Sequence, residues 1–196
     1  MVSAIVLAAG SSNRMGTPKA LLKIGEKSFL RHIVEVLYSS RVLDVVIVLG
    51  SGAEQIQQTL TWFNGKIVIN ENWKRGQLSS IIKGLDALEQ KDLHGIMICP
   101  VDRPLITQSL VVDLLQAFWK SKKKIIIPNY DGQRGHPVIF STDLLGELKR
   151  APHNVGARAI VRAHPEEIFE VRTDERGVII NIDTPEDYDT NVVQQV

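Results

Sequence analysis

The 196-residue sequence has a single cysteine and almost no excess of one charge over the other. Cys99 cannot form an internal disulfide, and one thiol does not make a zinc cluster. A formal net charge of +1 gives no general electrostatic attraction to nucleic acid polymers or acidic membranes. We therefore expect neither as a partner, and each basic group has to be judged by its own surroundings.

Long apolar runs are also missing, and no stretch approaches the length of a transmembrane helix. The apolar start lacks the basic region of a signal peptide, and cleavage there would remove an expected core strand. We expect a cytoplasmic protein. The composition, 44% hydrophobic and 23% charged, is that of a globular chain. We found no repeat or linker, so residues 1–196 are predicted to form one domain.

What the sequence does contain is a glycine-flanked, cationic loop. The apolar run at 4–7 predicts a strand, after which Gly10 and Gly16 enclose a loop that carries Arg14 and is followed by Lys19. Glycine lets backbone N–H groups approach an anion closely. Arginine adds a planar fork of donors and lysine a compact charge. This combination indicates a triphosphate site, although an ordinary turn between strand and helix with incidental charges is the alternative.

Two well-known phosphate loops do not fit this stretch. In a Walker A loop the two glycines are one residue closer together than Gly10 and Gly16, and the lysine follows the second glycine directly. A dinucleotide-binding loop needs a glycine where this chain has Ser12. The site is therefore neither a P-loop nor a dinucleotide fingerprint.

The string L-A-A-G-x-S-x-R-M-G-x-P-K-x-L-L over 7–22 resembles the signature of the MobA/MocA-like nucleotidyltransferases. It is most similar to the molybdenum cofactor cytidylyltransferase branch. Guanylyltransferase relatives usually have a second glycine where this chain has Ala9. A methyl group there is expected to reduce the room for a purine, which predicts CTP over GTP. The resemblance implies that the nucleotide is bound by Leu7, Ala8, Ala9, Gly10, Ser11, Arg14, Gly16 and Lys19.

Hydrophobic periodicity predicts alternating strands and helices in the first half of the chain. The expected elements are a helix over 28–39, a strand over 45–49, a helix over 53–62, a strand over 66–69, a helix from Gln77 and a strand over 95–99. This order predicts a mostly parallel, Rossmann-like sheet flanked by helices. The resemblance implies the GT-A-like fold of nucleotidyltransferases. It also implies a nucleotide-binding first half and an acceptor-binding second half.

The second half is less regular. We expect a helix over 108–120, a strand over 125–127, helical pieces over 142–149 and 156–163, and strands over 168–171 and 178–182. Thr184 and Pro185 have the residue types of a helix N-cap and first helical position.

Two aspartates follow predicted strands, Asp102 after the strand 95–99 and Asp183 after 178–182. Ligands of open α/β sheets bind outside the carboxyl ends of strands, and paired carboxylates at a triphosphate suit Mg²⁺. Either residue alone has a plainer interpretation as a turn or cap residue. The segments C-P-V-D-R-P and I-D-T-P-E-D-Y resemble the two metal-binding motifs of the family, which implies Asp102 and Asp183 as Mg²⁺ ligands.

A helix predicted to begin after Gly76 offers free N–H donors, and Gln77 and Ser79 have side chains that can read a base edge. The alternative is a simple helix N-terminus with Ser79 in solvent. The resemblance implies that Gly76, Gln77 and Ser79 contact base and ribose. We expect Trp73 to be a packing residue.

For the acceptor, the element R-G-H-P-V-x-F resembles one of the cytidylyltransferase branch and implies Arg134 and His136 as acceptor contacts. A second element, similar to G-D-x-G-A-R, implies Asn154 and Arg158. Here His153 and Asn154 replace the usual Gly-Asp pair. Arg103 also departs from the pattern, because the family often has a neutral residue there.

The resemblance, which spans 3–188, implies transfer of CMP from CTP to a phosphorylated acceptor with release of pyrophosphate. The implied acceptor is molybdopterin, and a client molybdoenzyme is the implied further partner. Lys19, Arg14 and Asp102 are the expected catalytic residues, with Mg²⁺ as cofactor. Alternatives are a guanylyltransferase, a sugar- or alditol-phosphate nucleotidyltransferase, or a non-catalytic chaperone that hands a cofactor to a client.

Overall fold

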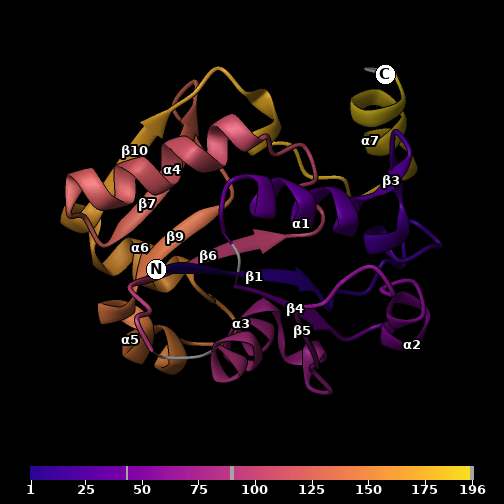
Figure 1. The fold of residues 1–196 in the computed structure, drawn as a ribbon, viewed down its shortest axis with the longest axis horizontal. Helices are drawn as coiled ribbons and strands as arrows, with labels where there is room; N and C mark the ends of the chain where they lie inside the picture. The colour runs from indigo at the N-terminus through magenta and orange to yellow at the C-terminus, as the bar shows by residue number, and fades with distance from the viewer. Residues whose placement is uncertain (43, 89–90, 195–196) are drawn as a thin grey trace.

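A central sheet carries the fold, and the computed structural model describes it over residues 1–42, 44–88 and 91–194 (Figure 1). Its strand order is β10-β7-β9-β6-β1-β4-β5, and β8 pairs with β7 outside this path. The strands are β1 Val2–Ala8, β4 Val45–Leu49, β5 Lys66–Ile69, β6 Gly95–Pro100, β7 Ile125–Tyr130, β8 Gln133–Arg134, β9 Val138–Ser141 and β10 Ile168–Arg172. A separate antiparallel pair, β2 Lys23–Ile24 and β3 Lys27–Ser28, follows the glycine loop.

The middle of the sheet is parallel because β1, β4 and β6 are apolar on both faces and need cover on both. All residues of these three strands are buried. β1 lies between the other two and is parallel to both, with Leu7 opposite Val48 and Pro100. The carboxyl ends of these strands therefore meet at one edge of the sheet. That edge receives the glycine loop after β1 and Asp102 after β6.

Helices cover both faces of the sheet, with α1 and α4 on one side and α3 and α5 on the other (Figure 1). The helices are α1 Phe29–Ser39, α2 Ala53–Gln57, α3 Gln77–Ala87, α4 Gln108–Ser121, α5 Leu145–Arg150, α6 Arg158–Ala163 and α7 Pro185–Tyr188. Alternate residues of β1 serve the two faces: Ala4 and Val6 pack with α1 and α4, whereas Ile5 and Leu7 pack with α3. The predicted α/β fold with a mostly parallel sheet is confirmed. Among the described residues, no helix combines the length and apolar character needed to cross a bilayer.

The predicted helix over 53–62 is too long, since α2 ends at Gln57. Past this point the hydroxyl of Thr59 donates to the Ile56 carbonyl, and Leu60 N donates to the Gln57 carbonyl. Threonine competes with the helix in this way because its side chain can bond to nearby backbone. The segment continues as turns.

The predicted strand over 178–182 is wrong. The chain there makes a 3₁₀ turn, Arg176–Val178, and continues without pairing to the sheet. Val178 and Ile182 are fully buried, so their apolar character was interpreted correctly as burial but not as strand pairing. Ile182 N instead donates to the Asp102 carbonyl over 2.8 Å. This contact brings the segment before α7 across the sheet edge, next to the loop that follows β6.

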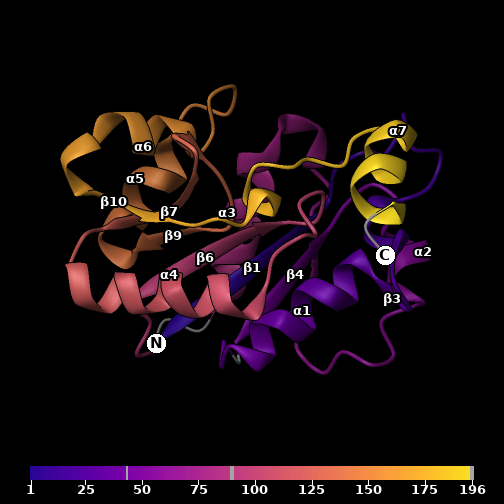
Figure 2. The same cartoon turned by 90° about the horizontal axis from the view of Figure 1, so that it is seen from above.

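The last helix begins as predicted. The Thr184 hydroxyl accepts from Asp187 N, the Asp187 carboxylate accepts from Thr184 N, and Pro185 is at the first turn. Figure 2 shows α7 beside β3, where the Tyr188 hydroxyl donates to the Lys23 carbonyl over 2.8 Å. The C-terminal segment is thereby anchored to the region that follows the glycine loop.

Candidate active site

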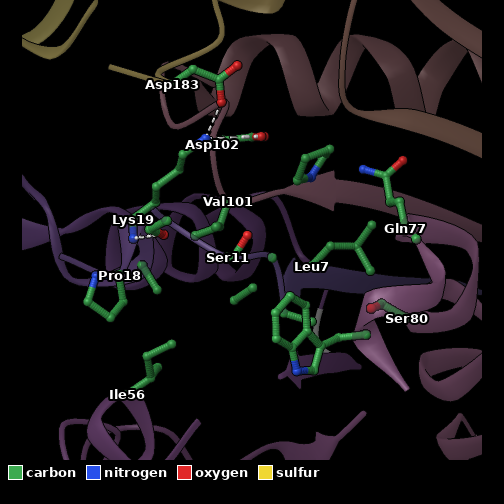
Figure 3. Close-up of a pocket in the computed structure, with 18 of the residues that line it drawn as sticks. Leu7, Ser11, Pro18, Lys19, Ile56, Gln77, Ser80, Val101, Asp102 and Asp183 are labelled. Carbon is green, nitrogen blue, oxygen red and sulfur yellow. Dashed lines mark hydrogen bonds and ion pairs between the residues drawn. The ribbon is translucent and has the colours of Figure 1, made fainter. Parts of the chain in front are cut away.

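Two adjoining cavities open at the carboxyl ends of β1 and β6. The first has a volume of about 380 Å³ and the second about 770 Å³. The first is lined by Leu7, Ala8, Ala9, Gly10, Ser11, Ser12, Pro18, Lys19, Ile56, Trp73, Gln77, Ser80, Asp102 and Asp183, among others (Figure 3). Both are lined by Lys74, Gly76, Gln77, Pro100 and Asp102. Asp102 therefore stands at their junction.

The glycine loop folds around Ser12. Its carbonyl accepts from Met15 N and Gly16 N, and its hydroxyl accepts from Lys19 N over 2.9 Å. Gly16 has a φ of +67°, a conformation that favours glycine, so it shapes the loop from outside the cavity wall. Gly10 lines the cavity, and a β-carbon built on it would meet nothing within 4 Å.

Lys19 joins the loop to both predicted metal ligands. Its ammonium contacts Asp183 Oδ1 and lies 3.7 Å from Asp102 Oδ2 (Figure 3). The Lys19 side chain is only 12% exposed. Arg14, which is 67% exposed, reaches Asp183 Oδ2 over 3.2 Å. The structure thus brings Arg14, Lys19, Asp102 and Asp183 together.

Asp183 is positioned by the start of α7. Asp187 Oδ2 accepts from Asp183 N over 2.9 Å, and Asn181 Nδ2 donates to Asp183 Oδ2 over 2.6 Å. The helix cap is Thr184, so the carboxylate of Asp183 faces the cations and is not used as the cap. The plainer interpretation of Asp183 as a cap residue does not describe this geometry.

The two carboxylates have different electrostatic surroundings. Burial raises the pKa of Asp102 above its ordinary value, and the charges of Lys19 and Arg103 oppose this only in part. Burial also acts to raise the pKa of Asp183, but the hydrogen bond and charge of Lys19 and the charge of Arg14 outweigh it and lower the pKa. The pKa values of the two carboxyl groups are therefore shifted in opposite directions, up for Asp102 and down for Asp183.

This pair fits a divalent cation. Two carboxylates converge on one ammonium, so the protein already provides a place for positive charge between them. Among the described residues no cluster of three or more His, Cys, Asp or Glu side chains could hold a metal by itself. Mg²⁺ suits such a pair, because it typically takes one or two carboxylates and completes its shell with water and substrate phosphates.

The predicted base contacts are only partly brought to the first cavity. Gly76, with a φ of +102°, and Gln77 at the start of α3 line it. Ser79 does not: its buried hydroxyl accepts from Asn70 Nδ2 and is within hydrogen-bonding reach of the Gly76 carbonyl, which holds the turn before α3. Ser80 lines the cavity in its place. Helical spacing was the available signal, because residues three apart share a helix face and Ser80 is three residues after Gln77.

Ala9 needs a correction. It lines the cavity but is only 3% exposed, and its methyl group packs against Gly50. A β-carbon on Gly50 would lie 2.8 Å from that methyl and 2.7 Å from the Ala9 carbonyl oxygen, so residue 50 has to be glycine. The methyl group therefore occupies packing space between the ends of β1 and β4, and little of it faces the cavity. This packing weakens the steric argument for CTP.

The second cavity collects the predicted acceptor residues, Arg134, His136, Asn154 and Arg158. Arg134 is held by Glu170, with Nη2 and Oε1 2.6 Å apart, and so already has a partner. Burial, and then the charge of Arg103, lower the pKa of His136 to about 4, so the imidazole is neutral at pH 7. Its buried Nδ1 has no partner among the described residues. Asn181 also lines this cavity. The only sign of a site role for Asn181 in the sequence was its place two residues before Asp183.

Cys99 is buried in β6, and burial raises the pKa of its thiol. A buried, protonated thiol is a poor nucleophile.

Comparison with known proteins adds the family. The model of the MobA-like NTP transferase domain matches residues 4–168, from β1 to the first residue of β10. The chain is 26% identical over 196 residues to the molybdenum cofactor cytidylyltransferase of Escherichia coli K12, covering 96% of this chain and 94% of that protein. It is 28% identical over 153 residues to a probable molybdenum cofactor guanylyltransferase of Mycobacterium avium, covering 76% and 74%.

A nicotine blue oxidoreductase of Paenarthrobacter nicotinovorans is 27% identical over 192 residues, covering 94% of this chain and 93% of that protein. The fold therefore supports more than one chemistry, and the argument for activity has to come from the site. Among solved structures, Rv0371c of Mycobacterium tuberculosis in complex with manganese has a TM-score of 0.83. It is 22% identical, with 98% of both chains covered, and this likeness shows the fold.

Proposed function

Because the chain belongs to the MobA-like NTP transferase family, we propose one reaction of that family for it: transfer of CMP from CTP to a molybdopterin-type phosphate, with release of pyrophosphate. The observation that carries the proposal is the position of Asp102. This carboxylate lines both cavities and stands beside Lys19 and Asp183. A group held in the first cavity can meet a group held in the second only at such a junction.

The reaction is a substitution at the α-phosphorus. An oxygen of the acceptor phosphate attacks, a new P–O bond forms, and the bond to the β-phosphate oxygen breaks. An ionised phosphate monoester has no proton to lose, so the step needs no general base and no protein nucleophile. Catalysis of this kind depends on positioning and on neutralising charge.

In this proposal, the glycine loop holds the triphosphate and Gln77 and Ser80 face the base. Lys19 leaves the carboxylates and stabilises the charge that develops on the α-phosphate and the leaving pyrophosphate. Arg14, which is largely exposed, contacts the outer phosphates. Asp102 and Asp183 would hold Mg²⁺, which when bound would supply positive charge to neutralise the phosphates.

The choice of CTP rests on similarity to the cytidylyltransferase branch, since the packing of Ala9 against Gly50 weakens the steric argument. The choice of a molybdopterin-type acceptor rests on the same relatives, and a molybdoenzyme that receives the product belongs to this proposal. A guanylyltransferase remains the second candidate, supported by relatives of that activity.

The test is pyrophosphate release with purified protein and Mg²⁺. CTP, GTP, ATP and UTP are each combined with molybdenum-loaded molybdopterin or with a sugar or alditol phosphate. We expect CTP with molybdopterin to be fastest and chelation of the metal to stop the reaction. Preference for GTP would replace this proposal with the guanylyltransferase, and a faster alditol phosphate would replace the acceptor. Binding of cofactor without pyrophosphate release from any pair would indicate a chaperone.

A further inference from the structure

The second cavity is surrounded by cations that have no carboxylate partner. Lys74, Arg75, Arg103, Arg158 and Arg162 all line it, and within the described part of the chain none of them lies within 4.0 Å of an acidic oxygen. Asp102 is the one acidic residue among those that line this cavity in the described ranges. Unpaired like charges repel one another, so a site of this kind is stabilised when an anion binds.

Arg103 differs from the other four. It is half-buried, whereas Lys74, Arg75, Arg158 and Arg162 are exposed. Its Nη1 donates to the Val178 carbonyl over 3.2 Å, which holds the guanidinium in place. A charge with less solvent around it is screened less, so a contact with an anion is worth more there.

Arg103 also follows Asp102 directly, at the junction of the cavities. Arg158 lines the same cavity as Arg103. Arg158 lies at the start of α6, 55 residues after Arg103 in the sequence.

We propose that Arg103 and Arg158 form a clamp for a phosphate monoester, which holds the acceptor phosphate beside Asp102. The proposal rests on the proposed function and names the group that the second cavity takes. Two planar forks suit the several oxygens of a phosphate. The attacking oxygen has to reach the junction, and Arg103 is the partly buried cation next to it. The neutral imidazole of His136 adds no competing charge at pH 7.

The experiment is a calorimetric titration of the full chain with inorganic phosphate as the probe. Arg103→Gln removes the charge and keeps a side chain of similar polarity. We expect the dissociation constant for phosphate to rise at least about tenfold, the loss that one charge-assisted hydrogen bond produces. Arg75→Gln is the matched control, because Arg75 lines the same cavity but is exposed, and it is expected to change the constant by less than about twofold.

Lys19→Ala identifies the cavity that the probe enters. Phosphate binding that survives Lys19→Ala and weakens in Arg103→Gln and Arg158→Gln supports the clamp. Binding that is lost in Lys19→Ala and unchanged in Arg103→Gln places the phosphate in the glycine loop and overturns it. An equal loss in Arg75→Gln and Arg103→Gln overturns it too, since a diffuse basic surface would then be responsible.

Two further measurements separate this inference from the proposed function. The thermal midpoint of each variant shows that it is folded. Pyrophosphate release by wild-type protein with unchanged phosphate binding in Arg103→Gln would reject the clamp and leave the nucleotidyltransferase intact. Weakened phosphate binding in Arg103→Gln without pyrophosphate release from any substrate pair would reject the reaction proposed above.

Discussion

The two cavities differ in how their charges are arranged. In the first, Lys19 and Arg14 are already paired with Asp102 and Asp183. In the second, five cations line the wall without a carboxylate partner in the described part of the chain. In the first cavity the protein's own cations and carboxylates neutralise one another, so a ligand that binds there has to replace existing ion pairs. In our proposal, the second cavity is already arranged to bind an anion.

This difference has a physical consequence for how ligands enter. A divalent cation alone gains little from a pair of carboxylates that two cations already neutralise. A triphosphate alone meets two carboxylates. In the proposed function the two ligands bind together: Lys19 and Arg14 would contact phosphate oxygens, and Asp102 and Asp183 would hold the metal. We therefore expect metal and nucleotide to bind the first cavity cooperatively.

The largest expected effect comes from removing either carboxylate. Asp102→Asn and Asp183→Asn are each expected to lower turnover by at least about a hundredfold, similar to the loss of one preorganised charge-stabilising group. Pyrophosphate release measures the effect. Asp86→Asn is the control, because Asp86 forms an exposed ion pair with Lys149. Turnover near wild type in Asp183→Asn, with an unchanged melting temperature, would show that Asp183 holds no metal.

Lys19→Ala tests whether the Lys19 ammonium neutralises charge that develops during the reaction. We expect turnover to fall by a factor of several tens. The reduction of kcat should exceed the increase of KM, because the ammonium acts on charge that develops during the reaction. Lys19→Arg is expected to rescue poorly, since a planar fork does not replace a compact ammonium. Lys23→Ala, an exposed lysine of β2, is the control.

The same variant has an effect of opposite sign on the metal. Without nucleotide, Mn²⁺ is expected to bind Lys19→Ala more tightly than wild type, because the competing ammonium is gone. Electron paramagnetic resonance of free Mn²⁺ measures this. Weaker Mn²⁺ binding in the variant would contradict the view that Lys19 lies where a cation binds.

The neutral state of His136 in the second cavity predicts how the stability of the protein depends on pH. Its pKa in the folded chain, about 4, lies below the ordinary value of 6.5, so the unfolded chain binds more protons between these values. The free energy of unfolding should therefore fall as the pH is lowered from about 6.5 to about 4. We expect His136 to account for about 2 kcal/mol of this fall, because its cavity admits some solvent.

Comparison of His136→Gln with wild type by denaturant unfolding at several pH values isolates this contribution, since the variant lacks that part of the acid-side loss. His164 gives a control of opposite sign. The hydrogen bond that His164 donates to Glu147 raises the pKa of His164, so its stabilising effect is present at low pH and is lost as the pH rises. An unchanged pH profile in His136→Gln would mean that the imidazole is solvated and titrates normally.

The smallest effect is expected from Ala9→Gly. The methyl group packs against Gly50 and is 3% exposed, so its removal should change the ratio of kcat/KM for CTP and GTP by less than about twofold. Ser80→Ala, which alters a side chain that lines the first cavity, is the comparison variant. A large gain of GTP use in Ala9→Gly would restore a steric role for this residue.

Local patterns in the sequence were sufficient for the parts of the fold that depend on neighbours along the chain. The continuous apolar run at 45–49 and the short strand predicted over 66–69 coincide with β4 and β5. Thr184 caps α7 because the capping bonds join residues only three apart. The glycine loop and the two aspartates were found because residue type and spacing carry their chemistry.

The tertiary structure decided everything that depends on which distant segments meet. The apolar character of Val178 and Ile182 predicted that they are buried. The sequence holds no sign that their segment crosses the sheet edge instead of pairing as a strand. The same holds for the contact between Ala9 and Gly50, and for the fact that no acidic oxygen of the described residues lies within 4.0 Å of the Arg103 guanidinium. Hydrophobic periodicity reports that a side chain is buried; it does not report the identity of the atoms that bury it, because those come from contacts far apart in the chain.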